Sequence, residues 1–249
     1  MKVIAIIPAR YHSSRFPGKP LAMIGDKSMI RRVFERVKLS GVTEAIIATD
    51  DDRILKHAEN FGAKVILTSS KHKTGTERCA EAYEKNGAAY EVVINVQGDE
   101  PFIDPAQIKL LSKTFEDQQI QIASLMEKIT KLEELEDPNT IKIAVDHQNF
   151  ALYFSRSVIP FMRDKTKKNW LKDKAYWKHI GIYAFRSSVL KEIVKLQSIQ
   201  IEAAESLEQL RWLYYGYRIK LLESSFGGIS VDTPEDLEQA NLILNNTYI

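Results

Sequence analysis

Short apolar runs and amphipathic segments alternate along the first half of the chain. Four runs rich in β-branched residues predict strands at Val3–Ile7, Ala45–Thr49, Val65–Thr68 and Val92–Val96. Apolar residues at helical spacing predict helices at Ser28–Val37, Arg53–Phe61, Arg78–Lys85 and Pro105–Phe115. Strands that alternate with helices form βαβ units. The pattern therefore predicts an α/β fold with a mostly parallel sheet covered by helices.

The pattern changes at about Ile122. Runs at Ile141–Val145 and Ala151–Ser155 flank an Asp-His-Gln-Asn turn and predict a β-hairpin. The later segments predict, in order, a strand at His179–Phe185, helices at Ser187–Leu196 and Glu202–Tyr215, a strand at Ile219–Glu223 and a helix from Pro234 to about Leu244. Because no repeat, low-complexity tract or Gly/Ser linker divides the chain, we predict one domain over residues 1–249 with an inserted lobe at about residues 122–216.

Composition narrows the class of protein. Lys plus Arg number 35 and Asp plus Glu 33, a net charge of +2, without the basic stripe that binding to nucleic acid or anionic membranes requires. No apolar stretch approaches the ~18 residues of a membrane span. The single cysteine, Cys79, excludes an internal disulfide and a cysteine-rich zinc site. We expect a cytoplasmic protein that binds neither nucleic acid nor membrane.

The loop after the first predicted strand is the first candidate site. The segment Pro8–Leu21 carries the cations Arg10, Arg15 and Lys19, the serine pair 13–14 and no acidic residue. Arginine forks and exposed amides suit the oxygens of a polyphosphate. A solvated basic loop is the alternative, but ligands bind at the carboxyl ends of strands in open α/β sheets, which favours phosphate. The loop lacks Walker A spacing, and no G-x-G-x-x-G occurs in the chain.

Two acidic segments are candidate metal sites. Asp99 and Glu100 follow the fourth predicted strand, and adjacent carboxylates there suit Mg²⁺, which binds few carboxylates and completes its shell with phosphate oxygens and water. A plain Gly-Asp-Glu-Pro turn also explains this segment. Asp232 precedes a helix start that Thr233 as N-cap and Asp236 in the first turn would explain. The residues alone leave both interpretations open.

A polar strand face lies in the second half of the chain. His179, Gly181 and Tyr183 share one face of their predicted strand, because side chains alternate along a strand. This face either lines a cleft or meets solvent. No H-E-x-x-H, G-x-S-x-G or Cys/His cluster offers a different catalytic site.

The predicted helix Glu202–Tyr215 has two faces. Helical spacing predicts that one set of residues packs inward, namely Leu207, Leu210, Tyr214 and Tyr217. A second set shares another face, namely Glu205, Glu208 and Gln209. A solvated helix surface is the ordinary explanation of the second set.

Several segments, taken together and in this order, resemble one family. The segments are Ile7–Leu21, Ala48–Asp51, Thr74–Arg78, Asn95–Pro101, Lys178–Tyr183, Leu207–Arg211 and Val231–Asp236. They resemble the cytidylyltransferases that activate acidic sugars. The His-x-Gly-x-Tyr and Leu-Glu-Gln-Leu-Arg segments resemble the branch that activates 3-deoxy-manno-octulosonate (Kdo) rather than the sialic acid enzymes. The resemblance runs from Val3 to the final helix.

The resemblance implies a fold and a reaction. The fold would be a nucleotide-diphospho-sugar-transferase-like (Rossmann-like) sheet whose inserted lobe serves dimerisation. The reaction would transfer CMP from CTP to the anomeric hydroxyl of Kdo, with Mg²⁺, and release pyrophosphate. The family enzymes are cytoplasmic homodimers whose product feeds lipopolysaccharide biosynthesis.

The resemblance also implies a role for individual residues. The nucleotide-binding residues would be Pro8, Ala9, Arg10, Arg15, Lys19, Arg78 and Gln97. The metal would be held by Asp99 and Asp232, which with Arg10 and Lys19 form the catalytic set. The Kdo pocket would be lined by Arg156, His179, Tyr183, Glu208 and Gln209.

Three other functions fit parts of the sequence. Another nucleotidyltransferase would activate sialic acid, an amino-substituted Kdo or a sugar phosphate. A glycosyltransferase would show an Asp-x-Asp metal motif, which Asp50–Asp52 contains, although this segment also fits a helix start before Arg53. A non-catalytic nucleotide sensor is the third, and the presence of both Asp99 and Asp232 argues against it.

Overall fold

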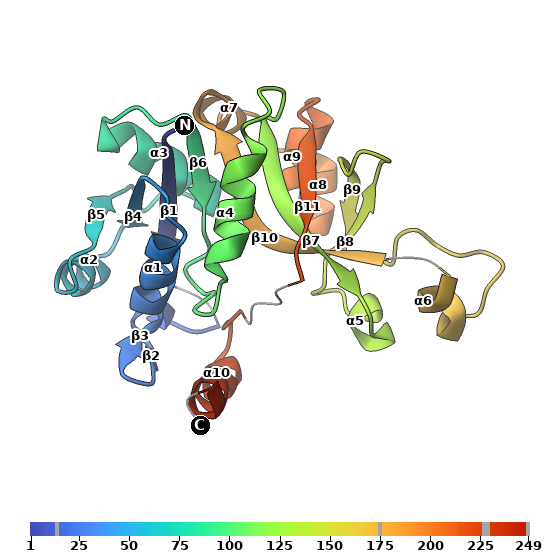
Figure 1. The fold of residues 1–249 in the computed structure, drawn as a ribbon, viewed down its shortest axis with the longest axis horizontal. Coiled ribbons are helices and arrows are strands. Elements are labelled where there is room, and N and C mark those ends of the chain that lie inside the picture. Colours follow the sequence, from blue (N-terminus) through green and yellow to red (C-terminus); the bar gives the residue numbers. More distant parts are fainter. Residues whose placement is uncertain (13–14, 174–175, 226–229, 248–249) are drawn as a thin grey trace. The chain divides into compact units, whose positions relative to one another are not determined.

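Parallel strands form the centre of the unit that residues 1–113 and 228–249 make up. The computed structural model describes residues 1–12, 15–173, 176–225 and 230–247. The strands lie in the order β6 (Val92–Asn95), β1 (Val3–Ala9), β4 (Glu44–Thr49) and β5 (Lys64–Leu67), and each neighbouring pair is parallel (Figure 1). The apolar residues of β1 are buried, as expected for a parallel strand covered on both faces. The predicted parallel sheet is confirmed.

The helices of this unit lie where the spacing of apolar residues predicts them, with ends shifted by up to three residues. They are α1 (Met29–Leu39), α2 (Asp52–Glu59), α3 (Gly75–Asn86), α4 (Pro105–Thr114) and α10 (Pro234–Thr247). Two small elements complete the unit, a hairpin of β2 (Met23–Ile24) with β3 (Lys27–Ser28), and the 3-10 helix η1 (Lys19–Leu21). Within the described ranges, no helix combines the length and the apolar character that crossing a bilayer requires.

The last helix packs on the small hairpin. A cluster of buried side chains joins Ile24 of β2 and Met29 of α1 to Val231 and Ala240 at the other end of the chain. This contact fixes the start of α10 beside the first loop of the chain. The position of Asp232 in space therefore depends on apolar packing by its neighbours.

The second unit, residues 114–227, has a mixed sheet. Strand β7 (Ile122–Ile129) pairs in parallel with β11 (Ile219–Glu223) and antiparallel with β10 (Tyr176–Arg186). The predicted hairpin is confirmed, because β8 (Lys142–Val145) and β9 (Ala151–Ser155) pair antiparallel. The expected lobe, residues 122–216, falls within this unit. Strand β7 was not predicted, since its Leu, Met, Glu and Lys residues favour helices and only its neighbours in the sheet make it a strand.

The helices of the second unit are short. They are η2 (Lys167–Asn169), α5 (Leu132–Glu136), α6 (Trp170–Asp173), α7 (Ser187–Ile193), α8 (Gln200–Glu205) and α9 (Gln209–Tyr214). The single helix predicted over Glu202–Tyr215 is wrong, because Ser206 adopts a left-handed conformation with φ 52° and separates α8 from α9. The break changes the helical phase. Leu207 and Leu210 are buried as predicted, whereas Tyr214 is 66% exposed.

Gly98 provides a test of how tightly β6 and β1 pack at their carboxyl ends. A Cβ atom at this position would lie 2.9 Å from the carbonyl oxygen of Pro8, which backbone movement alone can relieve. We expect Gly98→Ala to lower the free energy of unfolding by roughly 1–3 kcal/mol, measured by urea titration of tryptophan fluorescence. Gly181→Ala is the matched control, because a Cβ there meets no atom within 4 Å. Equal stabilities of the two variants would contradict the close approach.

Candidate nucleotide site

One cavity of about 300 Å³ opens at the carboxyl ends of β1 and β6. Its lining includes each residue for which the sequence predicts a nucleotide-binding or metal-binding role, namely Pro8, Ala9, Arg10, Arg15, Lys19, Arg78, Gln97, Asp99 and Asp232. The other lining residues have no predicted role and are Pro20, His72, Lys73, Thr74, Gly75 and Gly98. The structure thus brings the predicted residues to one place, as expected for ligand sites at strand ends. Their individual roles stay predictions.

Lys19 joins the two acidic segments. Its Nζ donates to Asp99 Oδ2 at 2.7 Å and to Asp232 Oδ1 at 3.0 Å. Because both distances meet at one nitrogen, these two carboxylate oxygens lie less than about 6 Å apart, well inside the ~10 Å beyond which one Mg²⁺ could not bind both. Arg15 adds a second cation, with Nη2 3.4 Å from Asp232 Oδ1. The cavity lining therefore carries more cations than carboxylates, and its two carboxylates are both paired with cations.

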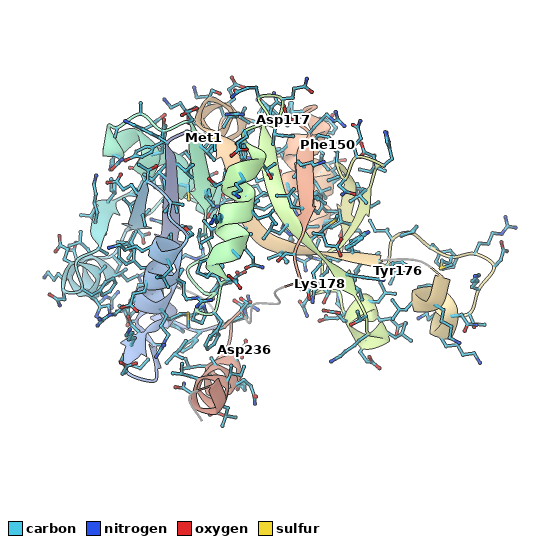
Figure 2. The ribbon with its side chains drawn as sticks, in the orientation of Figure 1. Met1, Asp117, Phe150, Tyr176, Lys178 and Asp236 are labelled. Carbon is cyan, nitrogen blue, oxygen red and sulfur yellow. The ribbon has the colours of Figure 1, made fainter. Side chains whose placement is uncertain are left out.

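Asp232 also belongs to the start of α10, as the capping interpretation predicts. Asp236 lies in the first turn of this helix (Figure 2). Its Oδ2 accepts hydrogen bonds from the backbone N–H groups of Asp232 and Thr233, both at 2.9 Å, and Thr233 Oγ1 accepts from Asp236 N at 3.2 Å. Burial would raise the pKa of Asp236, but these N–H donors lower it. The cap occupies the carboxylate of Asp236 and leaves that of Asp232 to face the cavity. The capping interpretation is confirmed, while the role of Asp232 as a metal ligand stays a prediction.

Asp99 and Glu100 are adjacent but differ in environment. Asp99 lines the cavity and binds Lys19, whereas Glu100 is not part of the cavity lining. Burial, and then the negative charge of Asp99, raise the pKa of Glu100 to about 7. Of the two carboxylates, Asp99 is the one placed to bind a cation.

The loop after β1 is held from both of its ends. Gly18 adopts a left-handed conformation, φ 73°, and its N–H donates to the Tyr11 carbonyl at 2.8 Å. The guanidinium of Arg53 at the start of α2 lies 3.3 Å from the centre of the Tyr11 ring. These contacts fix the backbone from which Lys19 projects. Ser13 and Ser14, the predicted hydroxyls of this loop, lie outside the described residues.

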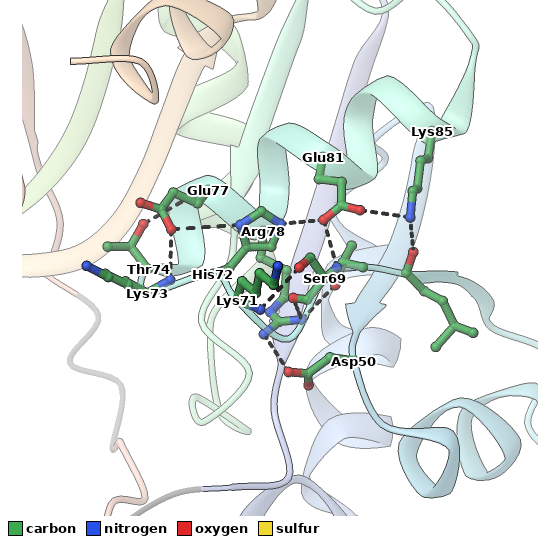
Figure 3. Close-up of polar contacts among 12 residues, drawn as sticks. Asp50, Ser69, Lys71, His72, Lys73, Thr74, Glu77, Arg78, Glu81 and Lys85 are labelled. Carbon is green, nitrogen blue, oxygen red and sulfur yellow. Dashed lines mark hydrogen bonds and ion pairs between the residues drawn. The ribbon is translucent and has the colours of Figure 1, made fainter. Parts of the chain in front are cut away.

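Arg78 is anchored within the unit by three acceptors. It projects from the first turn of α3 and its side chain is 5% exposed. Its Nη1 donates to Thr68 Oγ1 at 2.6 Å and, more weakly, to the Ser69 carbonyl at 3.4 Å. Its Nη2 donates to Asp50 Oδ2 at 3.1 Å (Figure 3). Arg78 is thus a buried cation with a paired charge that still lines the cavity.

The Asp-x-Asp pattern at Asp50–Asp52 does not form a shared metal site. Asp50 binds Arg78, while Asp51 is the N-cap of α2 and accepts from the backbone N–H of Arg53 at 2.9 Å. The interpretation as a loop and helix start is confirmed. The pattern therefore gives no support to a glycosyltransferase.

A network around Glu81 shapes the loop that leads into α3. The Glu81 carboxylate accepts hydrogen bonds from the Ser69 backbone N–H at 2.8 Å and from the His72 ring, and forms an ion pair with Lys85 at 2.7 Å (Figure 3). Burial alone would raise the pKa of Glu81, but these donors lower it to about 2. The network holds His72, which lines the cavity beside Lys73, whose backbone N–H donates to Glu77 Oε2 at 2.7 Å. No motif found in the sequence indicated this network, because its members are spread over a loop and two turns of helix.

Asp99 and Asp232 suit a magnesium ion, which needs few protein ligands, better than a metal ion bound by protein side chains alone. In the part of the chain that the structure describes, no three His, Cys, Asp or Glu side chains gather as a metal-binding group. Mg²⁺ commonly uses one or two carboxylates and takes its other oxygens from phosphate and water. Asp99 and Asp232, which already converge on one cation, supply this number.

The predicted acceptor residues lie in the second unit. His179 Nε2 is 2.9 Å from Ser124 Oγ, and Ser124 donates its own proton to the Ile182 carbonyl at 2.8 Å. His179 Nε2 therefore carries a proton and donates it in a hydrogen bond to Ser124 Oγ. Burial lowers the pKa of His179 to about 3, so the ring is neutral at neutral pH with Nδ1 as an acceptor.

Tyr183 and helix α9 meet in this unit. Burial, and then the negative charge of Glu208, raise the pKa of Tyr183 well above its usual value. The rings of Tyr183 and Trp212 pack edge to face at 5.0 Å. The Tyr183 hydroxyl and Trp212 Nε1 are buried and have no hydrogen-bond partner among the described residues. Gln209 is 5% exposed, so the expected solvated face is wrong for this residue.

Arg156 is fixed by the end of α8. Its backbone N–H and the Ser155 hydroxyl both donate to the Glu205 carboxylate, at 2.9 and 2.6 Å. Its Nε donates to the Glu205 carbonyl at 2.7 Å and its Nη1 to the Pro138 carbonyl at 3.0 Å. Glu205 therefore belongs to this contact and not to the face that Glu208 occupies. Lys142 is fully buried nearby, and burial lowers its pKa.

Comparisons with known proteins agree with this geometry. The sheet with its strand-end cavity has the nucleotide-diphospho-sugar-transferase type of fold. A glucose-1-phosphate thymidylyltransferase from Bacillus anthracis, described as putative, shares this fold at a TM-score of 0.67 and 18% identity, and the match covers 97% of this chain and 94% of that one. Residues 4–220 match the family described as Cytidylyltransferase. The chain belongs to the cytidylyltransferase family.

Close relatives refine the branch. Proteins named 3-deoxy-manno-octulosonate cytidylyltransferase from Phocaeicola vulgatus and Bacteroides thetaiotaomicron are 52% and 51% identical, over 98% and 99% of both chains. A solved structure of CMP:2-keto-3-deoxy-manno-octonic acid synthetase complexed with CTP is 40% identical, with a TM-score of 0.92, and covers 99% of this chain and 100% of that one. The resemblance identified from the motifs is confirmed.

The low pKa of Glu81 predicts a pH-dependent contribution to stability. A carboxylate whose folded pKa is about 2 stabilises the fold above the unfolded value of 4.5, and loses this contribution as the pH falls toward 2. We expect Glu81→Gln to lower the free energy of unfolding by roughly 1–3 kcal/mol at pH 7 and by less than half as much at pH 3, in urea titrations. Glu84→Gln, on the exposed side of the same helix, is the control. A deficit of the same size at both pH values would contradict the assigned pKa.

Proposed function

We propose that this protein transfers CMP from CTP to the anomeric hydroxyl of Kdo and releases pyrophosphate. The observation that carries the proposal is the cavity lined by Arg10, Arg15 and Lys19, in which two carboxylates converge on Lys19. Relatives that are 52% and 51% identical to this chain carry the name of that reaction.

The nucleotide half of the reaction needs positive charge and fixed positions. Displacement at phosphorus demands little covalent chemistry from the protein, and depends on holding the phosphates in line and neutralising the charge that develops. Arg10, Arg15 and Lys19 bind the triphosphate in this proposal, and Arg78 and Gln97 lie on the side of the base and ribose. The absence of a catalytic dyad in the sequence agrees with such a mechanism.

A magnesium ion fits the proposal. Asp99 and Asp232 would hold it, and it would supply charge neutralisation at the α-phosphate and a lower pKa of the attacking hydroxyl. Lys19 already balances both carboxylates, so the protein keeps them close together before any substrate arrives.

The acceptor half of the reaction needs hydrogen bonds. Kdo is a polyhydroxylated acid, and the neutral His179 ring, the protonated Tyr183 hydroxyl and the Glu208 carboxylate offer an acceptor, a donor and an acceptor. The unpartnered buried hydroxyl of Tyr183 supports a polar ligand at this place. In the proposal Arg156 binds the carboxylate of Kdo and Gln209 adds an amide to the pocket.

We also propose that the enzyme is a cytoplasmic homodimer whose product feeds lipopolysaccharide biosynthesis. Support for the dimer comes from large apolar side chains of the second unit that meet solvent, with Leu152 of β9 62% exposed and Phe161 72% exposed. The buried thiol of Cys79 agrees with a reducing compartment.

Pyrophosphate release from CTP, with and without Kdo, tests the proposed function. We expect release to require Kdo, and Asp99→Asn to reduce turnover by about 10³-fold or more because the protein loses a charge that positions the metal. Circular dichroism should show an unchanged fold. Asp26→Asn, which breaks an exposed ion pair with Arg32, is the control and should keep full turnover. Release of pyrophosphate from CTP without Kdo would overturn the choice of acceptor. Release that requires sialic acid or an amino-substituted Kdo instead would do the same.

Paired substitutions separate the two halves of the reaction. Glu208→Ala and Gln209→Ala should raise the KM for Kdo about 10-fold or more and change the KM for CTP little, because a site built around hydroxyl groups depends on each polar partner. Lys19→Met and Arg10→Met should show the opposite pattern, or lower kcat. Steady-state kinetics with each substrate varied in turn would measure both. If Glu208→Ala changed both KM values equally, our placement of the sugar pocket would be wrong.

Sedimentation equilibrium tests the dimer. We expect a mass of about twice 28.5 kDa at micromolar protein, since symmetric dimers are the commonest oligomers and exposed apolar side chains need a partner surface. Replacing Leu152 and Phe161 together by Glu should shift the equilibrium toward the monomer. A monomeric wild-type protein at this concentration would contradict the proposal.

A further inference from the structure

Two residues at strand ends accept hydrogen bonds from the guanidinium of Arg78. Asp50 and Thr68 hold its two Nη atoms from the ends of β4 and β5, at 3.1 and 2.6 Å. Such a buried guanidinium is fixed at two points, so it has little freedom to rotate about its stem. It still lines the cavity, where its remaining N–H groups are available to a ligand.

The donor and acceptor roles of the Thr68 hydroxyl are also fixed. Its hydroxyl donates to the Thr49 carbonyl at 3.1 Å, so the oxygen presents a lone pair to Arg78. A hydroxyl can otherwise rotate and reverse its role. The ends of β4 and β5 thus supply two acceptors to Arg78, a carboxylate and an oriented hydroxyl, and neither residue is part of the cavity lining.

We propose that Asp50 and Thr68 are positioning residues that hold Arg78 so that the nucleotide site selects cytosine over uracil. The inference rests on the proposed function, in which Arg78 meets the base. It assigns to the strand ends a role in choosing the nucleotide rather than in binding phosphate.

The chemistry of the two bases explains the selection. Cytosine presents two neighbouring acceptors, O2 and N3, whereas uracil presents the acceptor O2 beside a donor, N3–H. A guanidinium has only donors. Held in place, it serves both acceptors of cytosine but opposes one donor with another in uracil, and a buried donor left unpaired is costly. A guanidinium free to turn would bind O2 alone, which the two bases share.

A structural role alone makes a different prediction. If the contacts of Arg78 served only stability, their loss would lower the free energy of unfolding and weaken CTP and UTP equally. The ratio of the two affinities separates the alternatives, because unfolding of part of the protein cancels from it.

Calorimetric titration of the full chain with CTP and with UTP tests the inference. We expect Thr68→Val, which removes the hydroxyl at nearly constant volume, and Asp50→Ala to reduce the ratio of CTP to UTP affinity at least ~10-fold. Thr68→Ser should restore the ratio, since it keeps the acceptor. Asp26→Asn is the control for the loss of a carboxylate paired with arginine outside the cavity.

The outcomes are distinguishable. An unchanged ratio in Thr68→Val and Asp50→Ala, with Arg78→Met lowering it, would overturn the positioning role and leave Arg78 as the base-binding residue. An unchanged ratio and unchanged CTP affinity in Arg78→Met would overturn the base-binding role itself, and with it that part of the proposed function. If Asp50→Ala does not fold, the pair Thr68→Val and Thr68→Ser decides.

Discussion

The ammonium group of Lys19 is the contact around which the nucleotide cavity is built. It links carboxylates from two distant segments, one after β6 and one before α10. Hydrogen bonds within the loop after β1 hold the backbone of Lys19 in place. Two carboxylates this close would repel each other without a cation between them. Removing the charge of Lys19 therefore affects the placement of Asp99 and Asp232 as well as the contacts of Lys19 with a ligand. The Lys19 side chain is 13% exposed, against 26% for Asp99 and 38% for Asp232, so solvent screens the pair with Asp99 less than the pair with Asp232.

The two candidate subsites differ in how they treat charge. The cavity of the first unit pairs opposite charges, with Lys19, Arg15 and Arg78 each close to a carboxylate. The polar cluster of the second unit keeps His179 and Tyr183 neutral, because burial lowers the pKa of His179 and raises that of Tyr183. A polyanionic nucleotide calls for the first kind of environment. A sugar whose hydroxyl groups carry no charge calls for the second, since directional hydrogen bonds distinguish one hydroxyl pattern from another.

Much of the fold and of the candidate site could be predicted from the sequence, and physical reasons explain why the rest could not. Strands β1, β4 and β6 are buried on both faces, so their β-branched runs are visible, and their carboxyl ends place Arg10 and Asp99 together. The contact between Lys19 and Asp232 spans 213 positions, and only the resemblance to a family linked them. Strand β7 and the break at Ser206 escaped prediction because neighbouring elements decide them, not local preference. The Glu81 network has no periodic signal.

The capped start of α10 has a consequence for how the protein is made. A ribosome adds about 5–20 residues per second from the N-terminus, so Asp99 is joined to the growing chain on the order of ten seconds before Asp232. During that interval the parallel strands of the first unit are all present, while Lys19 has one of its two carboxylates and the apolar face of the β2 hairpin lacks its helix. The nascent chain therefore contains most of a nucleotide site without the second acidic group. Asp232 reaches Lys19 only when α10 packs on the β2 hairpin. In a chain whose final helix does not dock, the charge cluster therefore stays incomplete.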